Sequence, residues 1–344
     1  MTGRGIIKTI AINGLGRIGR LVLRHYAERP PGNIRLTTAN SSTSMEDLAY
    51  LIKYDSVHGK APFPVSYGRD YLMLGPHRLD IVNNRDPAKI PWKEHGIDIV
   101  LECTGVFTKR AGAAAHITAG ASKVIISAPS TDADATFVMG VNEKAFDPAH
   151  HHVVSNASCT TNSLAPVAKV LNDAFGIGSL MMTTVHAYTS SQALVDESAR
   201  KKRRGRAAAV SLVPSTTGAA EATALTIPAL NGRMHAMAIR APVPDGAITD
   251  IVVHLGRQVT VQEVNDTLKR AAENELAGIM EYCEDELVSA DIIGNPHSAI
   301  IDASSTAVVN GNVIKVMAWY DNEWGYARRL LDLASYMAER MEDG

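Results

Sequence analysis

The sequence predicts an α/β protein of two domains: a doubly wound parallel sheet, and an α+β domain with a mostly antiparallel sheet. Three observations support this. The chain has 344 residues, which corresponds to roughly two domains of about 150 residues. In its first half, continuous apolar strands alternate with helices, as in a parallel sheet covered on both faces. In its second half, strands of mixed polarity replace them.

The first half supplies its strands and helices in alternation. The predicted strands are 6–14, 34–39, 97–105 and 123–129. Apolar residues at helical spacing predict helices at 15–28, 45–54 and 111–121. Because parallel βαβ crossovers are right-handed, these elements build a doubly wound domain.

The second half changes in character after residue 159. Its predicted strands are 181–188, 234–242, 247–256 and 313–321. A helix is predicted at 261–275, and the chain ends in one amphipathic helix at 322–341. This order indicates an antiparallel or mixed sheet with helices on one face.

Composition excludes several classes of protein. Hydrophobic residues make up 46% of the chain and the formal net charge is −2, so nothing global favours nucleic acid or an anionic membrane. No apolar stretch reaches the ~18 residues of a membrane span, and the N-terminal segment lacks a signal peptide's apolar core. The three cysteines, Cys103, Cys159 and Cys283, are too far apart for a CxxC metal site, and an odd number argues against a disulfide framework. We therefore expect a cytoplasmic protein with no membrane association and no metal.

The segment INGLGRIGR carries Gly14, Gly16 and Gly19 directly after a strand and at the start of a helix. This is the context of the Rossmann-type dinucleotide fingerprint. The first glycine allows the tight turn, the second lets the backbone approach a pyrophosphate, and the third allows close packing of helix and strand. The helix N-terminus offers N–H groups to phosphates. A tight turn without a ligand is the alternative.

The end of the second strand lacks an acidic residue. A dinucleotide fold that binds NAD holds the ribose 2′-hydroxyl with an Asp or Glu here, but this chain reads TTANSSTS, with Ser41 and Ser42 at that point. A carboxylate would repel a 2′-phosphate, whereas serine hydroxyls can donate to one. The sequence therefore favours NADP over strict NAD dependence, although the serines could also cap the following helix.

Cys159 lies in SNASCTTNSLAPV at the predicted start of a helix. A free thiol has a pKa of ~8.5, which a helix N-terminus and a nearby histidine lower. His186 follows on the next predicted strand, where it can fold back beside the thiol. The alternative interpretation is a small buried hydrophobe and an ordinary core histidine.

The run RKKRRGR at 200–206 resembles a patch that binds nucleic acid or directs nuclear import. The remaining chain is not basic, and the run lies inside a domain rather than on a tail. A loop that binds phosphorylated small molecules, or a contact between subunits, fits better.

Together these motifs resemble phosphorylating glyceraldehyde-3-phosphate dehydrogenase over nearly the whole chain. The motifs that follow the glycine turn, in family order, are LIKYDSVHG, LECTGVF, VIISAPS, SNASCTTN, HAYT, PSTTGAA and WYDNEWGYA. The resemblance implies a dinucleotide-binding domain at 1–158, completed by the helix at 323–344, and a catalytic domain at 159–322. It also implies a homotetramer that oxidises glyceraldehyde 3-phosphate reversibly to 1,3-bisphosphoglycerate.

By this resemblance, Cys159 forms the thiohemiacetal and then the thioester. His186 is the base that activates the thiol and takes a proton as hydride leaves. The Cys159 N–H and the imidazolium hold the oxyanion. The site for the substrate's own phosphate is Thr189, Arg204 and Arg240. The site for the attacking inorganic phosphate is Ser158, Thr160, Thr217 and Gly218, with Arg204 able to bridge; helix capping is the default interpretation of Ser158 and Thr160 taken alone.

The resemblance also implies the residues that bind the cofactor. They are Gly14, Gly16, Arg17, Ile18, Gly19, Asn40, Ser41, Arg85, Thr104, Gly105, Ser127, Ser198, Asn322 and Tyr326. Asn322 is expected to fix the nicotinamide carboxamide and so decide which face meets the thiohemiacetal.

Three positions depart from the family's commonest pattern. Ser41 stands where the NAD-dependent form has aspartate, and Ser198 where it has proline. Together with Arg85, which could reach a 2′-phosphate, they predict that NADP is accepted and preferred, with NAD possible. Ser163 replaces a second cysteine, which removes a disulfide partner for Cys159.

Three other interpretations compete. Erythrose-4-phosphate dehydrogenase shares the fold and nucleophile, but Thr189 and the segment 214–220 favour glyceraldehyde 3-phosphate. A nucleic-acid-binding or regulatory role would rest on 200–206. A structural relative without activity is disfavoured by the presence of both Cys159 and His186.

Overall fold

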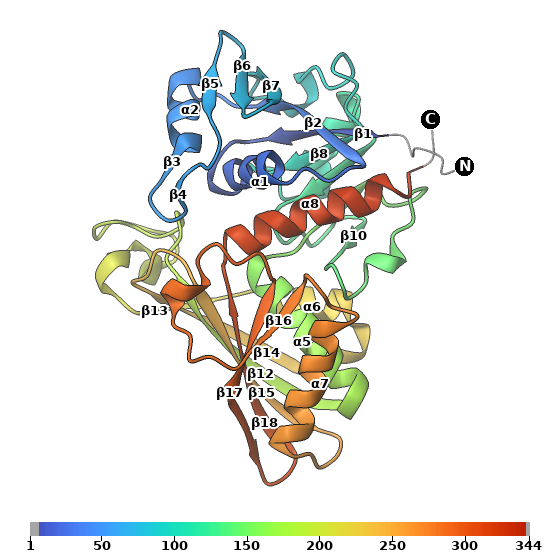
Figure 1. Ribbon diagram of the computed structural model, residues 1–344, viewed down its shortest axis with the longest axis vertical. Helices are drawn as coiled ribbons and strands as arrows, with labels where there is room; N and C mark the ends of the chain where they lie inside the picture. Colours follow the sequence, from blue (N-terminus) through green and yellow to red (C-terminus); the bar gives the residue numbers. More distant parts are fainter. Residues whose placement is uncertain (1–6, 342–344) are drawn as a thin grey trace. The chain divides into compact units, whose positions relative to one another are not determined.

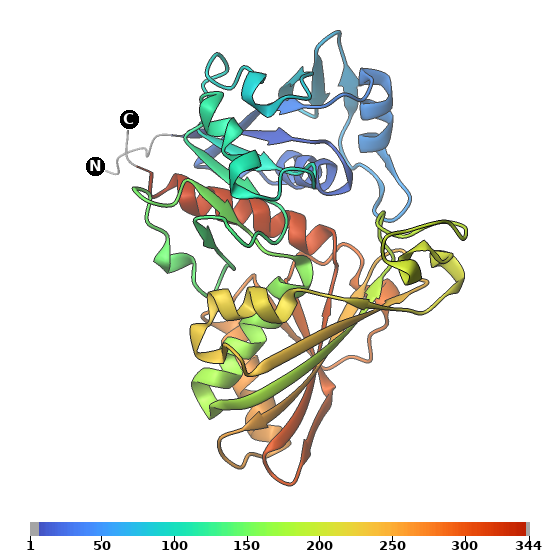
Figure 2. The same cartoon turned by 180° about the vertical axis from the view of Figure 1, so that it is seen from behind.

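The computed structural model describes residues 7–341, which form two compact units (Figures 1 and 2). The first unit extends to Ala157 and resumes at Ala327, and the second is Ser158–Tyr326. Each unit is built around a sheet of its own. No helix of residues 7–341 is long and apolar enough to cross a membrane.

The sheet of the first unit has nine strands in the order β10-β11-β9-β8-β1-β2-β7-β6-β5. Its strands are β1 Lys8–Asn13, β2 Ile34–Asn40, β5 Val65–Tyr67, β6 Tyr71–Leu74, β7 His77–Val82, β8 Ile99–Glu102, β9 Lys123–Ile126, β10 Ala135–Thr136 and β11 Val153–Ser155. All neighbours are parallel except β5/β6 and β6/β7. The strand order reverses at β1, between β2 and β8, and ligands of such sheets bind at the carboxyl ends of the strands at this point.

Helices flank this sheet. They are α1 Arg17–Glu28, α2 Met45–Lys53, α3 Arg110–Ala113, α4 Ala115–Thr118 and most of α8 Trp324–Ala338, with a small hairpin of β3 Tyr54–Asp55 and β4 Gly59–Lys60 and 3₁₀ turns at Pro87–Lys89 and Glu143–Ala145. In Figure 1, α1 and α8 cover one face of the sheet. The side chains of Asn33 and Ser335 bond to each other and tie α8 to this unit.

The single helix predicted at 111–121 is wrong in detail. The structure has two short helices, α3 and α4, which meet at Ala114. Gly112 lies in the first of them, and Gly120, with φ of 110°, ends the segment. Glycine weakens a helix interior and permits positive φ, so this stretch does not sustain one long helix.

The second unit contains a mixed seven-stranded sheet in the order β13-β14-β12-β15-β18-β17-β16. Its strands are β12 Ile177–Ala187, β13 Val213–Thr216, β14 Met234–Ala241, β15 Ala247–Leu255, β16 Met280–Cys283, β17 Ala299–Val309 and β18 Val313–Tyr320. Only β12/β14 and β16/β17 are parallel, so antiparallel pairs predominate, which confirms the predicted fold class.

Three longer helices pack on one face of this sheet (Figure 1). They are α5 Cys159–Phe175, α6 Ala219–Thr226 and α7 Val261–Glu273, with 3₁₀ turns at Lys202–Gly205, Ala208–Val210, Pro228–Leu230 and Ser289–Ile292. The α7 helix starts with a capping box between Thr260 and Glu263. Along β12 and β15 burial alternates, and Met181, Val185 and Val252 project on the exposed side. The sheet therefore keeps an apolar face that no element of this unit covers.

Candidate active site

Cys159 is the first residue of α5, and a tight turn delivers it there. Ala157 adopts a φ of 54°, which is rare for a residue with a Cβ. Ser158 is the N-cap, and its Oγ accepts from Thr161 N at 3.1 Å. Capping, the default interpretation of Ser158, is therefore confirmed. The N–H groups of the first helical turn have no partner further back in the helix, so a charge at Cys159 faces partial positive charge.

His186 lies beside the thiol, near the end of β12. Its Nε2 is 3.5 Å from Cys159 Sγ, and the ring is 4% exposed. In the parallel register of β12 and β14, His186 is opposite Arg240. Arg240 Nη1 consequently reaches His186 Nδ1 at 2.6 Å. The structure thus brings together the two predicted catalytic residues and one predicted phosphate ligand.

The pKa values of this pair run against the prediction of an activated thiol. Burial raises the pKa of Cys159 to about 11, even though Arg240 and hydrogen bonds from Thr160 act in the opposite direction. Burial, followed by the charge of Arg240, lowers the pKa of His186 to about 3. In this structure burial therefore opposes the lowering of the thiol pKa that the helix N-terminus is expected to cause.

Tyr320, at the end of β18, contacts the site although no role was predicted for it within the segment WYDNEWGYA. Its Oη is 3.0 Å from Thr160 Oγ1 and 2.8 Å from Thr184 Oγ1, and its ring meets that of His186 edge-on. The Thr160 side chain is therefore buried and directed into the unit. A phosphate near Cys159 would meet the backbone of Thr160 rather than a free hydroxyl.

A second cluster joins two of the predicted phosphate ligands. Thr189 Oγ1 lies 2.9 Å from Ser191 Oγ, and Arg204 Nη1 lies 3.5 Å from the same oxygen. Arg204 Nε also donates to Ser215 Oγ at 3.0 Å. Ser191 and Ser215 were not predicted: Ser191 follows HAYT by two residues, and Ser215 lies inside PSTTGAA, where roles were predicted only for Thr217 and Gly218.

The chain around Arg204 forms a cationic hollow of about 390 Å³. All of its charged lining residues are basic: Lys201, Lys202, Arg203 and Arg204. Thr217 and Gly218 lie nearby in sequence, just before α6, where Thr217 Oγ1 accepts from Ala219 N at 3.3 Å. Helix α6 packs against α5, so both helices belong to the layer that covers one face of the second unit's sheet.

The first unit holds a hollow of about 510 Å³ at the carboxyl ends of β1, β2 and β8. Gly14 has a φ of 95°, and a Cβ there would come within 2.8 Å of Thr104 N. A Cβ on Gly19 would come within 2.1 Å of Gly14 O, whereas the space around Gly16 is open. These positions fit the three roles predicted for the glycines, and the open one leaves the backbone free to approach a pyrophosphate.

The lining of this hollow contains no carboxylate. It consists of Asn13, Gly14, Leu15, Gly16, Arg20, Asn40, Ser41, Ser42, Thr43, Asn84, Arg85, Cys103, Thr104, Val106 and Phe107. Its charged members are both arginines, and Arg85 is exposed. The hollow therefore suits an anionic ligand.

Hydrogen bonds beneath the hollow fix its shape and occupy some of the predicted cofactor ligands. Asn40 Nδ2 donates to Asn13 Oδ1 at 2.7 Å, and Asn40 Oδ1 accepts from Asn84 N at 2.8 Å. The buried Glu102 accepts from both the backbone N and the Oγ1 of Thr104 and pairs with His116. Asn40 and Thr104 thus use their side chains mainly to hold the loops.

Arg17 is held in the same way. Its guanidinium pairs with Asp55. Burial alone would raise the pKa of Asp55, but hydrogen bonds from Arg17, His58 N and Val57 N lower it to about 2. The Arg17 side chain therefore orders the turn after α2, while the backbone of Arg17 and Ile18 begins α1.

The remaining predicted cofactor residues are divided between the units. Gly105, with φ of 70°, continues the Thr104 loop, and Ser127 N donates to Glu102 O at 3.0 Å. Ser198, Asn322 and Tyr326 belong to the second unit. Ser198 is exposed on the loop before the cationic run, whereas Asn322 and Tyr326 are buried where β18 leads into α8.

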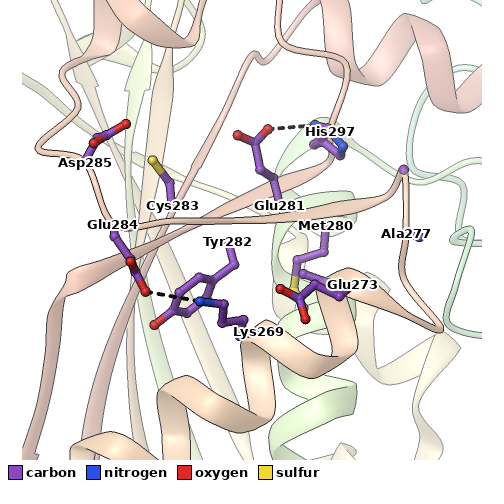
Figure 3. Close-up of a pocket in the computed structure, with 12 residues that line it drawn as sticks. Lys269, Glu273, Ala277, Met280, Glu281, Tyr282, Cys283, Glu284, Asp285 and His297 are labelled. Carbon is purple, nitrogen blue, oxygen red and sulfur yellow. Dashed lines mark hydrogen bonds and ion pairs between the residues drawn. The ribbon is translucent and has the colours of Figure 1, made fainter.

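A different hollow of the second unit, about 630 Å³, lies along the edge strand β16 (Figure 3). Its lining includes Glu273, Glu281, Glu284 and Asp285, and none of the predicted site residues. Figure 3 shows two ion pairs in its wall, Glu281 with His297 and Lys269 with Glu284. This acidic hollow is unsuited to an anionic substrate, so the candidate site remains at Cys159.

Comparison with known proteins agrees with both units. Residues 8–110 match the family model of the glyceraldehyde 3-phosphate dehydrogenase NAD binding domain, and residues 158–322 match that of its C-terminal domain. Glyceraldehyde-3-phosphate dehydrogenases from Priestia megaterium and Geobacillus stearothermophilus are each 51% identical over 331 residues, covering 96% of this chain and 98% of theirs. Glyceraldehyde-3-phosphate dehydrogenase 2 of Bacillus subtilis is 49% identical over 333 residues, or 97% of each chain. With its thiol–imidazole pair at a helix start and its glycine-lined hollow, the chain belongs to the glyceraldehyde-3-phosphate dehydrogenase family.

Proposed function

We propose that this protein converts glyceraldehyde 3-phosphate, inorganic phosphate and NADP⁺ to 1,3-bisphosphoglycerate and NADPH, reversibly, and that NAD⁺ can replace NADP⁺. The observation that carries the proposal is Cys159 Sγ at the start of α5, 3.5 Å from Nε2 of a buried histidine. The experiment is a steady-state assay with glyceraldehyde 3-phosphate and phosphate, with both cofactors in parallel. Absence of turnover with either cofactor would contradict the proposal.

In the proposed reaction His186 Nε2 takes the thiol proton, and the thiolate adds to the aldehyde carbon. The oxyanion that forms is held by the Cys159 N–H and by the imidazolium, which returns its proton to give the thiohemiacetal. The nicotinamide, when bound, supplies a hydride acceptor. His186 then accepts the proton of the thiohemiacetal hydroxyl, which leaves a thioester on Cys159. Inorganic phosphate attacks this thioester and releases 1,3-bisphosphoglycerate and the thiolate.

The proposed reaction needs two anion sites, because the substrate carries one phosphate and inorganic phosphate attacks the thioester. We assign the substrate's phosphate to Thr189, Arg204 and Arg240, because the first two share Ser191 and the third contacts His186. We assign the attacking phosphate to Ser158, Thr217, Gly218 and the backbone of Thr160. Guanidinium forks, hydroxyls and helix N-termini are the groups that bind phosphate oxygens.

The preference for NADP is supported by the lining of the first unit's hollow. Ser41 stands at the end of β2, its Oγ accepts from Thr43 N at 3.2 Å, and Arg85 supplies a positive charge. A 2′-phosphate would meet hydroxyls and a cation there, with no carboxylate to repel it. The ratio of kcat/KM for NADP and NAD measures the preference, and a strong bias toward NAD would contradict it.

A homotetramer is supported by apolar surface that the unit leaves open. Leu194 is 81% and Val210 80% exposed on the loops around the cationic run. Met181, Val185, Met237 and Val252 are exposed on the strands of the second unit. Copies of this chain would cover such surface, which monomers rarely expose. Light scattering after size-exclusion chromatography gives the mass, and a monomer at micromolar concentration would contradict the proposal.

A cytoplasmic localisation is also proposed, because the three cysteines are free thiols, which a reducing compartment maintains.

Two alternatives make distinct predictions. Erythrose-4-phosphate dehydrogenase would turn over without a strict need for inorganic phosphate, which the same assay tests. Nucleic-acid binding would need the basic run to be available. However, Lys201, Arg204 and Arg206 bond to Thr216, Ser215 and Asp196, so these three side chains are directed along the protein's own surface.

A further inference from the structure

The carboxylate of Glu102, at the end of β8, is buried and surrounded by hydrogen-bond donors. Its Oε2 accepts from Asn13 Nδ2 at 2.6 Å and from His116 Nε2 at 2.9 Å. Its Oε1 accepts from the backbone N of Thr104 at 2.8 Å and also from the Thr104 hydroxyl. An ionised carboxylate offers about four lone-pair sites. The four donors therefore use all of them, on a side chain that is 1% exposed.

The ring of His116 can act only as a donor toward Glu102. Trp92 Nε1 lies 2.9 Å from His116 Nδ1, and an indole N–H donates but never accepts. His116 Nδ1 therefore carries no proton, and the ring proton is on Nε2, which donates to the carboxylate. Both rings are fully buried, so water does not replace either bond.

The amide of Asn13 is fixed in the same sense from its other end. Asn13 Oδ1 accepts from Asn40 Nδ2 at 2.7 Å, so the NH₂ group of Asn13 faces Glu102. Asn40 cannot turn over, because its Oδ1 accepts from Asn84 N and its Nδ2 donates to Asn84 O, both at 2.8 Å. The 3.3 Å contact between Asn13 Nδ2 and His116 Nε2 joins two donors that converge on one carboxylate oxygen.

These hydrogen bonds end on loops that line the hollow of about 510 Å³ in the first unit. At one end, Asn84 precedes Arg85, to which we assigned the 2′-phosphate. At the other end, Thr104 N would lie 2.8 Å from a Cβ added to Gly14, so it packs against the turn that is expected to bind the pyrophosphate. Glu102 lies beneath both loops and is not part of the lining itself.

We propose that Glu102 is a positioning residue that fixes, through Thr104 and Asn13, the two loops between which the dinucleotide binds. Its negative charge is required, because an amide at this place would present an N–H group to donors that cannot become acceptors. The inference rests on the proposed function in that it takes NADP or NAD as the ligand. It adds that a side chain outside the lining determines how tightly the dinucleotide binds.

The variant Glu102→Gln tests the charge, because it keeps the shape of the side chain. Wherever its NH₂ group turns, that group meets a donor, which is Thr104 N on one side and His116 Nε2 on the other. We expect the Kd for NADPH and for NADH, measured by fluorescence titration of the full-length protein, to rise on the order of tenfold. Backbone hydrogen exchange of residues 103–107 should become faster in the free protein.

A second substitution distinguishes loss of positioning from loss of folding. In the double variant Glu102→Gln/Asn13→Asp the carboxylate is moved to residue 13. There it accepts from the new amide, from His116 Nε2 and from Asn40 Nδ2. The glutamine oxygen keeps both bonds from Thr104, so every donor again has a partner. We expect a Kd for NADPH within about threefold of wild type, whereas Asn13→Asp alone brings two carboxylates together and should weaken binding.

The matched control is Asp98→Asn, just before the other end of β8. Asp98 Oδ2 accepts from Thr9 N at 2.7 Å, so this carboxylate also ties β8 to β1, but away from the hollow. Asp98→Asn should lower Tm and leave the Kd for NADPH unchanged. At saturating NADP⁺, Glu102→Gln should form the acyl-enzyme with the wild-type single-turnover rate constant, because the loss is in binding.

Wild-type affinity in Glu102→Gln would overturn the proposal, and so would an equal loss of affinity in Asp98→Asn. The double variant tests the proposal even where Glu102→Gln does not fold, because it must fold and bind NADPH; a double variant that binds no better than the single ones overturns it. An active enzyme whose Kd ignores Glu102 refutes this role alone, whereas a wild-type protein without turnover refutes the proposed function.

Discussion

Removing the hydroxyl of Tyr320 tests whether the buried hydrogen bonds behind Cys159 hold the second unit together. In Tyr320→Phe, the contacts to Thr160 at 3.0 Å and Thr184 at 2.8 Å are lost. Each contributes about 1 kcal/mol net, and a buried hydroxyl left without a partner costs about 1–3 kcal/mol more. Thr184 is fully buried in a strand, so its hydroxyl accounts for most of this second cost. We expect the free energy of unfolding to fall by about 3 kcal/mol.

Thermal unfolding of the full-length protein measures this loss, which corresponds to a fall in Tm of roughly 6–12 °C. Tyr50→Phe, at a tyrosine that is 61% exposed, is the control and should leave Tm unchanged. Adding Thr184→Val to Tyr320→Phe should recover part of the loss, because it removes the unpartnered hydroxyl. The reasoning is refuted if Tyr320→Phe unfolds like wild type, or if Thr184→Val lowers Tm further in that background.

Three further predictions concern cofactor choice, acid stability and catalysis. Ser41→Asp should lower the NADP:NAD ratio of kcat/KM about tenfold or more, since a carboxylate near a 2′-phosphate costs on the order of 1–2 kcal/mol when partly screened; an unchanged ratio would contradict the role of Ser41. The hydrogen-bonded Asp55 has a pKa of about 2, so the stability from its pair with Arg17 is full above about pH 4 and is lost as the pH falls toward 2. Urea unfolding at pH 5 and pH 3 should therefore show a larger acid loss for wild type than for Asp55→Asn, and equal losses would refute it. His186→Asn should reduce the single-turnover rate constant of acyl-enzyme formation about 10²–10⁴-fold, and a wild-type rate constant would exclude His186 as the base.

The features that the sequence predicted well depend on local rules. The glycine turn was predictable because Gly14 and Gly19 have roles fixed by the backbone around them. The start of α5 at Cys159 followed from a Ser N-cap and a helical apolar run. These signals lie within one turn and one helix, so a single stretch of sequence contains them.

What was missed depends on contacts between distant segments. Tyr320 reaches Thr160 across 160 residues of chain; both lie in motifs, SNASCTTN and WYDNEWGYA, but no pattern within either segment predicts the pairing. The burial of Cys159, which opposes a lowered thiol pKa, could not be predicted either, because desolvation is a property of the packed unit rather than of the helix start. The strand β17 also went unpredicted, since its first five residues are all buried and its pattern does not alternate there.

The register of β12 against β14 has a consequence for how this enzyme could be redesigned. His186 and Arg240 occupy one rung of the sheet, on neighbouring parallel strands. Side chains on one rung are fixed side by side by the backbone ladder, so neither can be moved without shifting the whole strand. Replacing Arg240 therefore also changes the surroundings of His186, because Arg240 Nη1 contacts His186 Nδ1. Substitutions at either position are therefore best selected together with substitutions at the other.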